Sequence, residues 1–215
     1  MKPTTDKKAE AERIIKAARE HIFKHGFRSL SLDKLAKKLG IPVKTVYAHF
    51  HTKPLLIMAA LSDKMDEVDR EQQAIHARKD ITFAEHMQMV NDMVHRHSLE
   101  YSPNFVRDLT NTPALHKWAH NLRSEILRDG IAQTFKLGQR EGTIRDDIHA
   151  ELFSDIYLTL TDGVLIGSTL KKDKDTDLPE TIKRLLTVLL KGALVRCGEE
   201  SVRDQPKAKK TRGRK

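Results

Sequence analysis

The sequence predicts an all-α fold, in which a small N-terminal helical module precedes a larger helical domain. Apolar residues recur at intervals of three and four along most of the chain, as Ile14, Ala18 and Ile22 do near its start. This spacing is typical of helices with one buried face. The sequence shows no alternating β pattern, glycine-rich phosphate loop or tandem repeat, so we expect helices alone.

The N-terminal part predicts three helices behind a flexible basic arm at residues 1–8. The first helix is amphipathic and stops at Gly26. The second covers residues 32–39, where Ser31 can accept hydrogen bonds from its first free amides. Gly40 suits the left-handed conformation that often ends a helix.

A short third helix follows, with an apolar edge formed by Val43, Val46 and Phe50. Its other edge carries basic, hydroxyl and aromatic groups that we expect to face outward: Lys44, Thr45, Tyr47 and His49. A packed helix pair whose second member presents such groups has the shape that enters the major groove of DNA. The pattern therefore predicts a helix-turn-helix.

Motifs across residues 10–60 resemble the TetR family of bacterial transcriptional repressors. The matching residues are Ile15, Ala17, Ala18, Phe23, Gly26, Phe27, Leu35, Ala36, Gly40, Ile41, Thr45, Tyr47, His49, Phe50, Lys53, Leu55 and Leu56. Pro54 departs from the family, which usually has an acidic residue there. The resemblance implies a ligand-responsive regulator, most often a repressor that a small molecule releases from a palindromic operator, and the sequence leaves activation open.

Two groups of side chains are candidates for contact with DNA. We expect the first group to reach bases and nearby phosphates: Val43, Lys44, Thr45 and Tyr47. The second group should position the module on phosphates: Ser31, His49 and Lys53. For His49 this role is implied by the family resemblance.

The charge of the chain is concentrated at its two ends. The total is +9, but residues 1–53 carry +8 and residues 203–215 carry +6, while the part between them carries −5. Basic ends on a mildly acidic protein fit a polyanionic partner. Cys197 is the sole cysteine, which fits a reducing compartment. No signal-peptide core or membrane-spanning run is visible, so we expect a cytoplasmic bacterial protein that associates with the nucleoid when bound to DNA.

Beyond Lys53 the periodicity predicts helices over residues 53–77, 83–97, a short piece between Pro103 and Pro113, about 115–142, 147–170 and 179–197. The corresponding domains are 1–52 for DNA binding, 53–202 for ligand binding and dimerisation, and 203–215 as a disordered basic tail.

The last two helices carry more apolar surface than one buried stripe requires, so they need partners on two sides. A second copy of the chain is one such partner, and a deeply buried internal helix pair is the alternative. The resemblance implies a four-helix bundle across a two-fold axis. The predicted homodimer interface is Ile156, Leu160, Gly163, Gly167, Leu186, Leu190 and Ala193.

The resemblance also implies an effector pocket enclosed by the helices between. Its predicted lining is Met87, Met89, Met93, Phe105, Trp118, Phe135, Tyr157 and Thr161. Methionines re-pack easily around varied ligands, although they also serve as ordinary core. The sequence shows no cluster of acids or bases that would select a charged ligand.

Eleven histidines raise the question of a metal site. His116 and His120 are four residues apart and could share an ion, but no nearby cysteine or carboxylate completes a site. We therefore predict no metal and no cofactor, and treat His21, His25, His51 and His76 as surface groups. No nucleophile motif supports an enzyme. An architectural protein that coats DNA without sequence choice stays an alternative, which footprinting would distinguish.

Overall fold

The computed structural model describes residues 4–166 and 178–194, and within these ranges it contains helices and no strands. The all-α prediction is confirmed. The helices are α1 (Thr4–His25), α2 (Leu32–Leu39), α3 (Val43–His49), α4 (Lys53–His76), α5 (Phe83–Ser98), α6 (Pro103–Thr110), α7 (Pro113–Arg140), α8 (Ala150–Ile166) and α9 (Leu178–Ala193).

Most predicted helices appear within a few residues of their expected bounds, but the N-terminal arm is an exception. Residues 4–8 were expected to be flexible and instead form the first turns of α1. Asp6 lies in the first turn, where an acidic group stabilises the helix through its dipole. The Nζ of Lys8 lies 4.0 Å from Oε1 of Glu12, one turn further along. The predicted tail 203–215 and Cys197 lie outside the described residues, as do residues 171–177 between the last two predicted helices.

The helix-turn-helix is set by its caps. The hydroxyl of Ser31 accepts a hydrogen bond from the amide of Lys34 at 3.4 Å, as predicted. Gly40 adopts the left-handed conformation, with φ of 68°, and its N–H points at the last carbonyls of α2. Leu35 and Val46 are buried on the facing sides of the two helices. This packing fixes α3 on α2 and leaves its other side outward.

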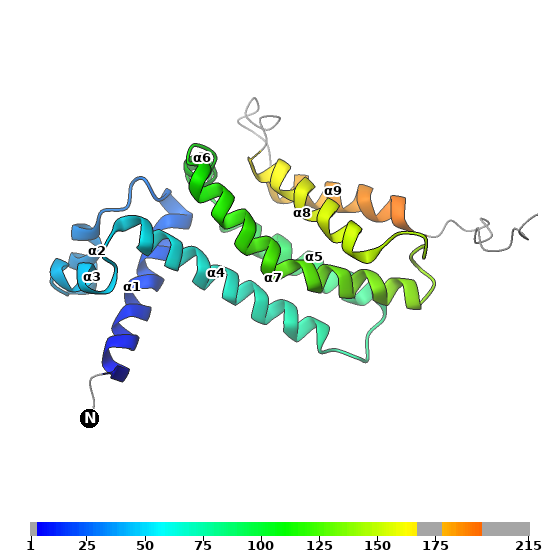
Figure 1. Cartoon of the computed structure of the whole chain (residues 1–215), viewed down its shortest axis with the longest axis horizontal. Coiled ribbons are helices and arrows are strands. Elements are labelled where there is room, and N and C mark those ends of the chain that lie inside the picture. Colours follow the sequence, from blue (N-terminus) through cyan, green and yellow to red (C-terminus); the bar gives the residue numbers. More distant parts are fainter. Residues whose placement is uncertain (1–3, 167–177, 195–215) are drawn as a thin grey trace, which may run out of the picture.

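The molecule is elongated, with α1, α2 and α3 at one end and α4 leading away from them (Figure 1). One apolar core lies at that end and combines α1 and α2 with the first half of α4 and Phe105 of α6. The second core lies between α5, α7, α8 and α9, where the rings of Phe135 and Phe153 stack at 4.2 Å. Because the first core continues past residue 52, α4 is packed into the DNA-binding module and the larger domain at once.

His76, predicted as a surface group, is the last residue of α4, and its ring contacts α7. Its Nε2 is 2.7 Å from the carbonyl oxygen of Gly130 and 3.1 Å from the hydroxyl of Thr134. The ring also meets His86 edge-on, at 4.8 Å between centroids. The prediction was wrong because the sequence pattern does not show that the end of α4 crosses α7.

The loop from α1 to α2 should tolerate a side chain at Gly26 poorly. Gly26 has φ of +82°, and a Cβ there would lie 2.5 Å from the Asp108 carboxylate. We expect Gly26→Ala to lower the free energy of unfolding by about 3 kcal/mol, from backbone strain and overpacking together. Gly142→Ala is the control, since its φ is +70° but no neighbour lies within 4 Å among the described residues; it should cost about 1 kcal/mol. Equal losses in urea denaturation would contradict the contact with Asp108.

Candidate nucleic-acid interface and internal cavities

The outer side of α3 presents a small polar and aromatic surface. The Tyr47 ring is 48% exposed, Lys44 is exposed and Thr45 is half-buried. Val43 is half-buried and packs against the first core, so only part of its side chain can reach a base. These four positions agree with a helix that approaches DNA through Lys44 and Tyr47 first.

The three predicted phosphate contacts already have partners within the protein. Ser31 caps α2, and the Nε2 of His49 lies 2.8 Å from Glu10 Oε2 on α1. The ammonium of Lys53 donates to the carbonyl oxygen of Arg28 at 3.0 Å, and burial lowers the pKa of Lys53 although Asp108 opposes this. A phosphate would therefore have to compete with Glu10 for His49, a competition that sequence spacing could not reveal.

The loop that carries Arg28 is tied to α6. The buried carboxylate of Asp108 accepts a hydrogen bond from the Arg28 amide at 2.8 Å. Nearby, the amide of Ser102 donates to the carbonyl oxygen of Phe23 at 3.0 Å. We call Arg28, Asp108 and their contact the α6 link. It joins the DNA-binding module to a helix that also lines a cavity.

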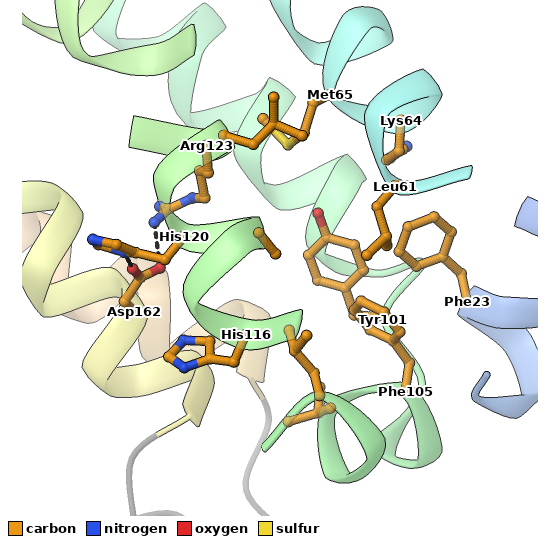
Figure 2. A pocket seen from close by; sticks show the side chains of 14 residues that line it. Phe23, Leu61, Lys64, Met65, Tyr101, Phe105, His116, His120, Arg123 and Asp162 are labelled. Atoms are coloured by element: carbon orange, nitrogen blue, oxygen red, sulfur yellow. Dashed lines mark hydrogen bonds and ion pairs between the residues drawn. The ribbon is translucent and has the colours of Figure 1, made fainter. Parts of the chain in front are cut away.

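This first cavity is bounded by α1, α4, α6, α7 and α8, and its empty volume is about 650 Å³ including the part that is open to solvent. Figure 2 shows aromatic rings on one side, from Phe23, Tyr101 and Phe105, and polar groups on the other. The complete lining is Phe23, Leu61, Lys64, Met65, Tyr101, Phe105, Val106, Leu109, His116, Ala119, His120, Leu122, Arg123 and Asp162. One wall therefore comes from α1 and another from α6.

The polar side of the cavity is a cluster that the sequence did not reveal. Arg123 Nη1 lies 2.6 Å from Asp162 Oδ1, and Nη2 lies 2.6 Å from the hydroxyl oxygen of Thr161. His120 Nδ1 also contacts Asp162. Burial lowers the pKa of Arg123. The sequence could not show this cluster because its groups come from α7 and α8, about 40 residues apart.

His116 also lies on this polar side of the cavity. The Nε2 of His116 is buried and has no hydrogen-bond partner within the described part of the chain. Burial lowers the pKa of His116, and so does the charge of His120. A neutral imidazole nitrogen that faces a cavity can donate to or accept from a ligand, depending on its tautomer.

A second cavity lies between α4, α5, α7 and α8, with an empty volume of about 480 Å³ including the part that is open to solvent. Its walls are mainly apolar, but Gln72 Oε1 and Asn91 Oδ1 are both buried there, with no hydrogen-bond partner in the described residues. Buried acceptors normally find a donor. An N–H or O–H group of a ligand would satisfy them.

The eight residues predicted to line one pocket are therefore distributed. Phe105 lines the first cavity, whereas Met87, Phe135 and Tyr157 line the second. Met89 and Met93 belong to a small core between α4 and α5, and Trp118 packs against the first core. Thr161 is buried beside Arg123 without lining either cavity. Helical spacing alone does not distinguish core from cavity wall.

An apolar stripe runs along the outer side of α8. Leu152, Ile156 and Leu160 are 53%, 40% and 38% exposed, respectively. At Gly163 an added Cβ would meet nothing within 4 Å among the residues described. On α9, Val188 is also exposed. Large apolar side chains at four-residue intervals on a surface are typical of an interface.

The other predicted interface positions divide into two groups. Gly167 and the side chains of Leu186 and Leu190 lie outside the described residues. Ala193 is 2% exposed and belongs to the second core of its own subunit, so its assignment to the interface was wrong. It turns inward because the end of α9 pairs with the segment after α7, where Arg145 N–H donates to the Ala193 carbonyl at 3.0 Å.

Two further properties bear on function. Among the described residues, one group brings three potential metal-ligand atoms within 4.8 Å of one another, namely Glu67, His97 and Glu100. The pair His116 and His120 is not part of such a group. No described helix is both long and apolar enough to cross a membrane.

The chain matches known regulators in sequence and in fold. Residues 14–60 match the family model described as bacterial regulatory proteins of the tetR family. The regulator UidR of Escherichia coli is 29% identical over 169 residues, which cover 75% of this chain and 82% of UidR. UidR is described as an HTH-type transcriptional regulator.

Solved structures share the architecture at lower sequence identity. A transcriptional regulator from Cytophaga hutchinsonii aligns with a TM-score of 0.69 and 18% identity over 86% of this chain and 99% of its own. A regulator from Saccharomonospora viridis in complex with choline aligns with a TM-score of 0.64 and 19% identity, over 88% of this chain and 100% of its own. SmeT, the repressor of a Stenotrophomonas maltophilia multidrug efflux pump, aligns with a TM-score of 0.63 and 15% identity, over 86% of this chain and 90% of its own.

Together with the helix-turn-helix, these matches describe a DNA-binding protein whose relatives regulate transcription and are not enzymes. Residues 14–60 thus carry the DNA-binding domain of the tetR family of bacterial regulatory proteins, and the chain as a whole is similar to regulators of that family.

Proposed function

We propose that this protein is a dimeric repressor that a small molecule releases from a palindromic operator. The observation that carries the proposal is the shared wall of the first cavity. Phe23 of the DNA-binding module and Phe105 of α6 line the same space. A molecule bound there would touch the module itself and would favour the arrangement of the module that it binds better.

The DNA contacts in this proposal follow the exposed side of α3. Lys44, Thr45 and Tyr47 would reach bases and adjoining phosphates, and the exposed part of Val43 would meet a thymine methyl group. Ser31, His49 and Lys53 would contact phosphates. For His49 and Lys53 this contact replaces the intramolecular partners described above.

The α6 link provides a physical route between ligand and DNA. An occupant that displaces Phe105 or Val106 moves α6, and Asp108 on the same helix holds the Arg28 amide. The loop between α1 and α2 would follow. A change in the angle of α3 within each subunit would alter the distance between the two recognition helices of a dimer. Because the two half-sites of an operator lie at a fixed separation, the dimer would then no longer fit both.

The proposed effector is an apolar molecule with one polar end. Its apolar body would pack on Tyr101 and Phe105, and its polar group would meet the unpartnered nitrogen of His116. The choline complex of the Saccharomonospora viridis regulator supports the general idea of a small-molecule ligand inside this fold.

Filling the first cavity should block the effector. Ala119 of α7 lines it, and Ala119→Phe would place a ring in that space. We expect compounds that raise the melting temperature of the wild type and release it from an operator selected from random DNA to do neither with this variant. Ala114→Phe, on the exposed side of α7, is the control. Equal release from both variants would move the effector site to the second cavity.

Glu10 should restrain DNA binding by holding His49. In Glu10→Ala the imidazole is free for a phosphate, so we expect about threefold tighter operator binding and a salt slope steeper by about 0.9. Glu12→Ala is charge-matched, since Glu12 lies on the same helix and pairs only with exposed Lys8 at 4.0 Å among described groups. If fluorescence anisotropy gives the same gain for both variants, His49 has no special role.

The outer stripe of α8 should hold the dimer together. Ile156→Glu combined with Leu160→Glu would place carboxylates in a surface that excludes water, which costs several kcal/mol. We expect a folded monomer by light scattering and a loss of operator binding. Leu99→Glu introduces a carboxylate at another exposed leucine and should leave the dimer intact. A double variant that keeps dimer mass would show that α8 is not in the interface.

A further inference from the structure

A compact polar cluster lies where α4 passes the end of α5, apart from the proposed DNA contacts. Its carboxylates come from Glu67 and Glu100, and its imidazole comes from His97. The Nδ1 of His97 lies 3.8 Å from Glu67 Oε1 and 3.7 Å from Glu100 Oε1. All three ligand atoms lie within 4.8 Å of one another, a spacing that one cation could span.

The orientation of His97 is fixed from its other nitrogen. Nε2 lies 2.9 Å from Glu71 Oε2, and because an ionised carboxylate only accepts, Nε2 carries the proton of this hydrogen bond. The ring is 7% exposed, and its Nδ1 is buried without a hydrogen-bond partner in the described parts of the chain. Both facing carboxylate oxygens are beyond hydrogen-bond distance. Nδ1 therefore faces two carboxylate oxygens and has no hydrogen-bond partner among the described residues.

The same two oxygens already attract a positive charge. Lys64 is 1% exposed, and its Nζ lies 3.2 Å from Glu67 Oε1 and 2.5 Å from Glu100 Oε1. Burying an ammonium is costly unless it is paired. The two carboxylates therefore already stabilise one buried cation. Lys64 also lines the first cavity, as its position in Figure 2 shows. Its ammonium thus has a second space available.

We propose that a divalent transition-metal ion of the zinc type binds Glu67 Oε1, Glu100 Oε1 and His97 Nδ1, in place of the Lys64 ammonium. One imidazole and two carboxylates suit such an ion. Glu71 would act on the metal indirectly, because a carboxylate that holds the distal nitrogen orients a histidine ligand and strengthens it. Water would complete the coordination. The site is separate from the proposed effector contacts of His116.

The ion would act on the DNA-binding module through Glu67. The other oxygen of this carboxylate, Oε2, lies 2.6 Å from Arg19 Nη2 on α1. A metal on Oε1 would draw negative charge from that ion pair, while the displaced Lys64 ammonium would turn toward the first cavity. Metal binding is therefore expected to change operator affinity and to favour anionic occupants of the cavity.

Calorimetric titration of the full chain with Zn²⁺ tests the site. We expect one strong site per subunit that His97→Gln weakens by about 100-fold, since the amide nitrogen of glutamine can still donate to Glu71 but the ligand lone pair is gone. His95→Gln, an exposed histidine on the same helix, should bind within about twofold of the wild type. Equal losses in both variants, or no strong site in the wild type, would overturn the proposal.

Lys64→Met should change zinc affinity in the opposite direction to His97→Gln. Without the competing ammonium, Zn²⁺ should bind about tenfold more tightly, and it should raise the melting temperature of this variant more than that of the wild type. Scattered surface histidines would not respond to Lys64. Unchanged or weaker zinc binding by a folded Lys64→Met protein would contradict the proposed competition.

Discussion

The packing of α4 is the constraint on which the rest of this structure depends. The first half of the helix buries Leu56, Ala60 and Leu61 in the core that it shares with α1 and α2. Its second half buries Val68 and Ile75 against α5. A buried helix surface cannot slide without losing these contacts. The helix therefore joins the larger domain to the DNA-binding module as a nearly rigid body.

Polar contacts also join the DNA-binding module to α4 and α6. Asp108 holds the Arg28 amide, and Arg19 of α1 pairs with Asp63 and Glu67 of α4, at 2.8 Å and 2.6 Å. Each contact is specific to one arrangement, because a hydrogen bond weakens steeply with misalignment. The apolar core stabilises the joint between the domains, whereas these polar contacts select its angle. In the proposed mechanism, a ligand would act through either the core or these polar contacts.

The buried charges are grouped around the first cavity for a physical reason. Arg123 of α7 pairs with Asp162 of α8, and Lys64 pairs with Glu67 on the same helix and with Glu100 just after α5. Such pairs contribute little net stability when buried, yet they become costly when one partner is removed. They are thus suited to a region where a ligand or an ion exchanges partners. The proposed effector site and metal site lie at the two ends of this region, with Lys64 between them.

The sequence by itself determined the helical class, the helix-turn-helix and its caps, because these depend on interactions within about four residues. Ser31 and Gly40 could be assigned from local chemistry. The tertiary structure alone decided which residues meet. It separated Met93 from the cavities, turned Ala193 inward and brought Arg123 to Asp162 and His97 to Glu67. These outcomes depend on the angles between packed helices, and a 3.6-residue period shows that a face is buried without showing what lies against it.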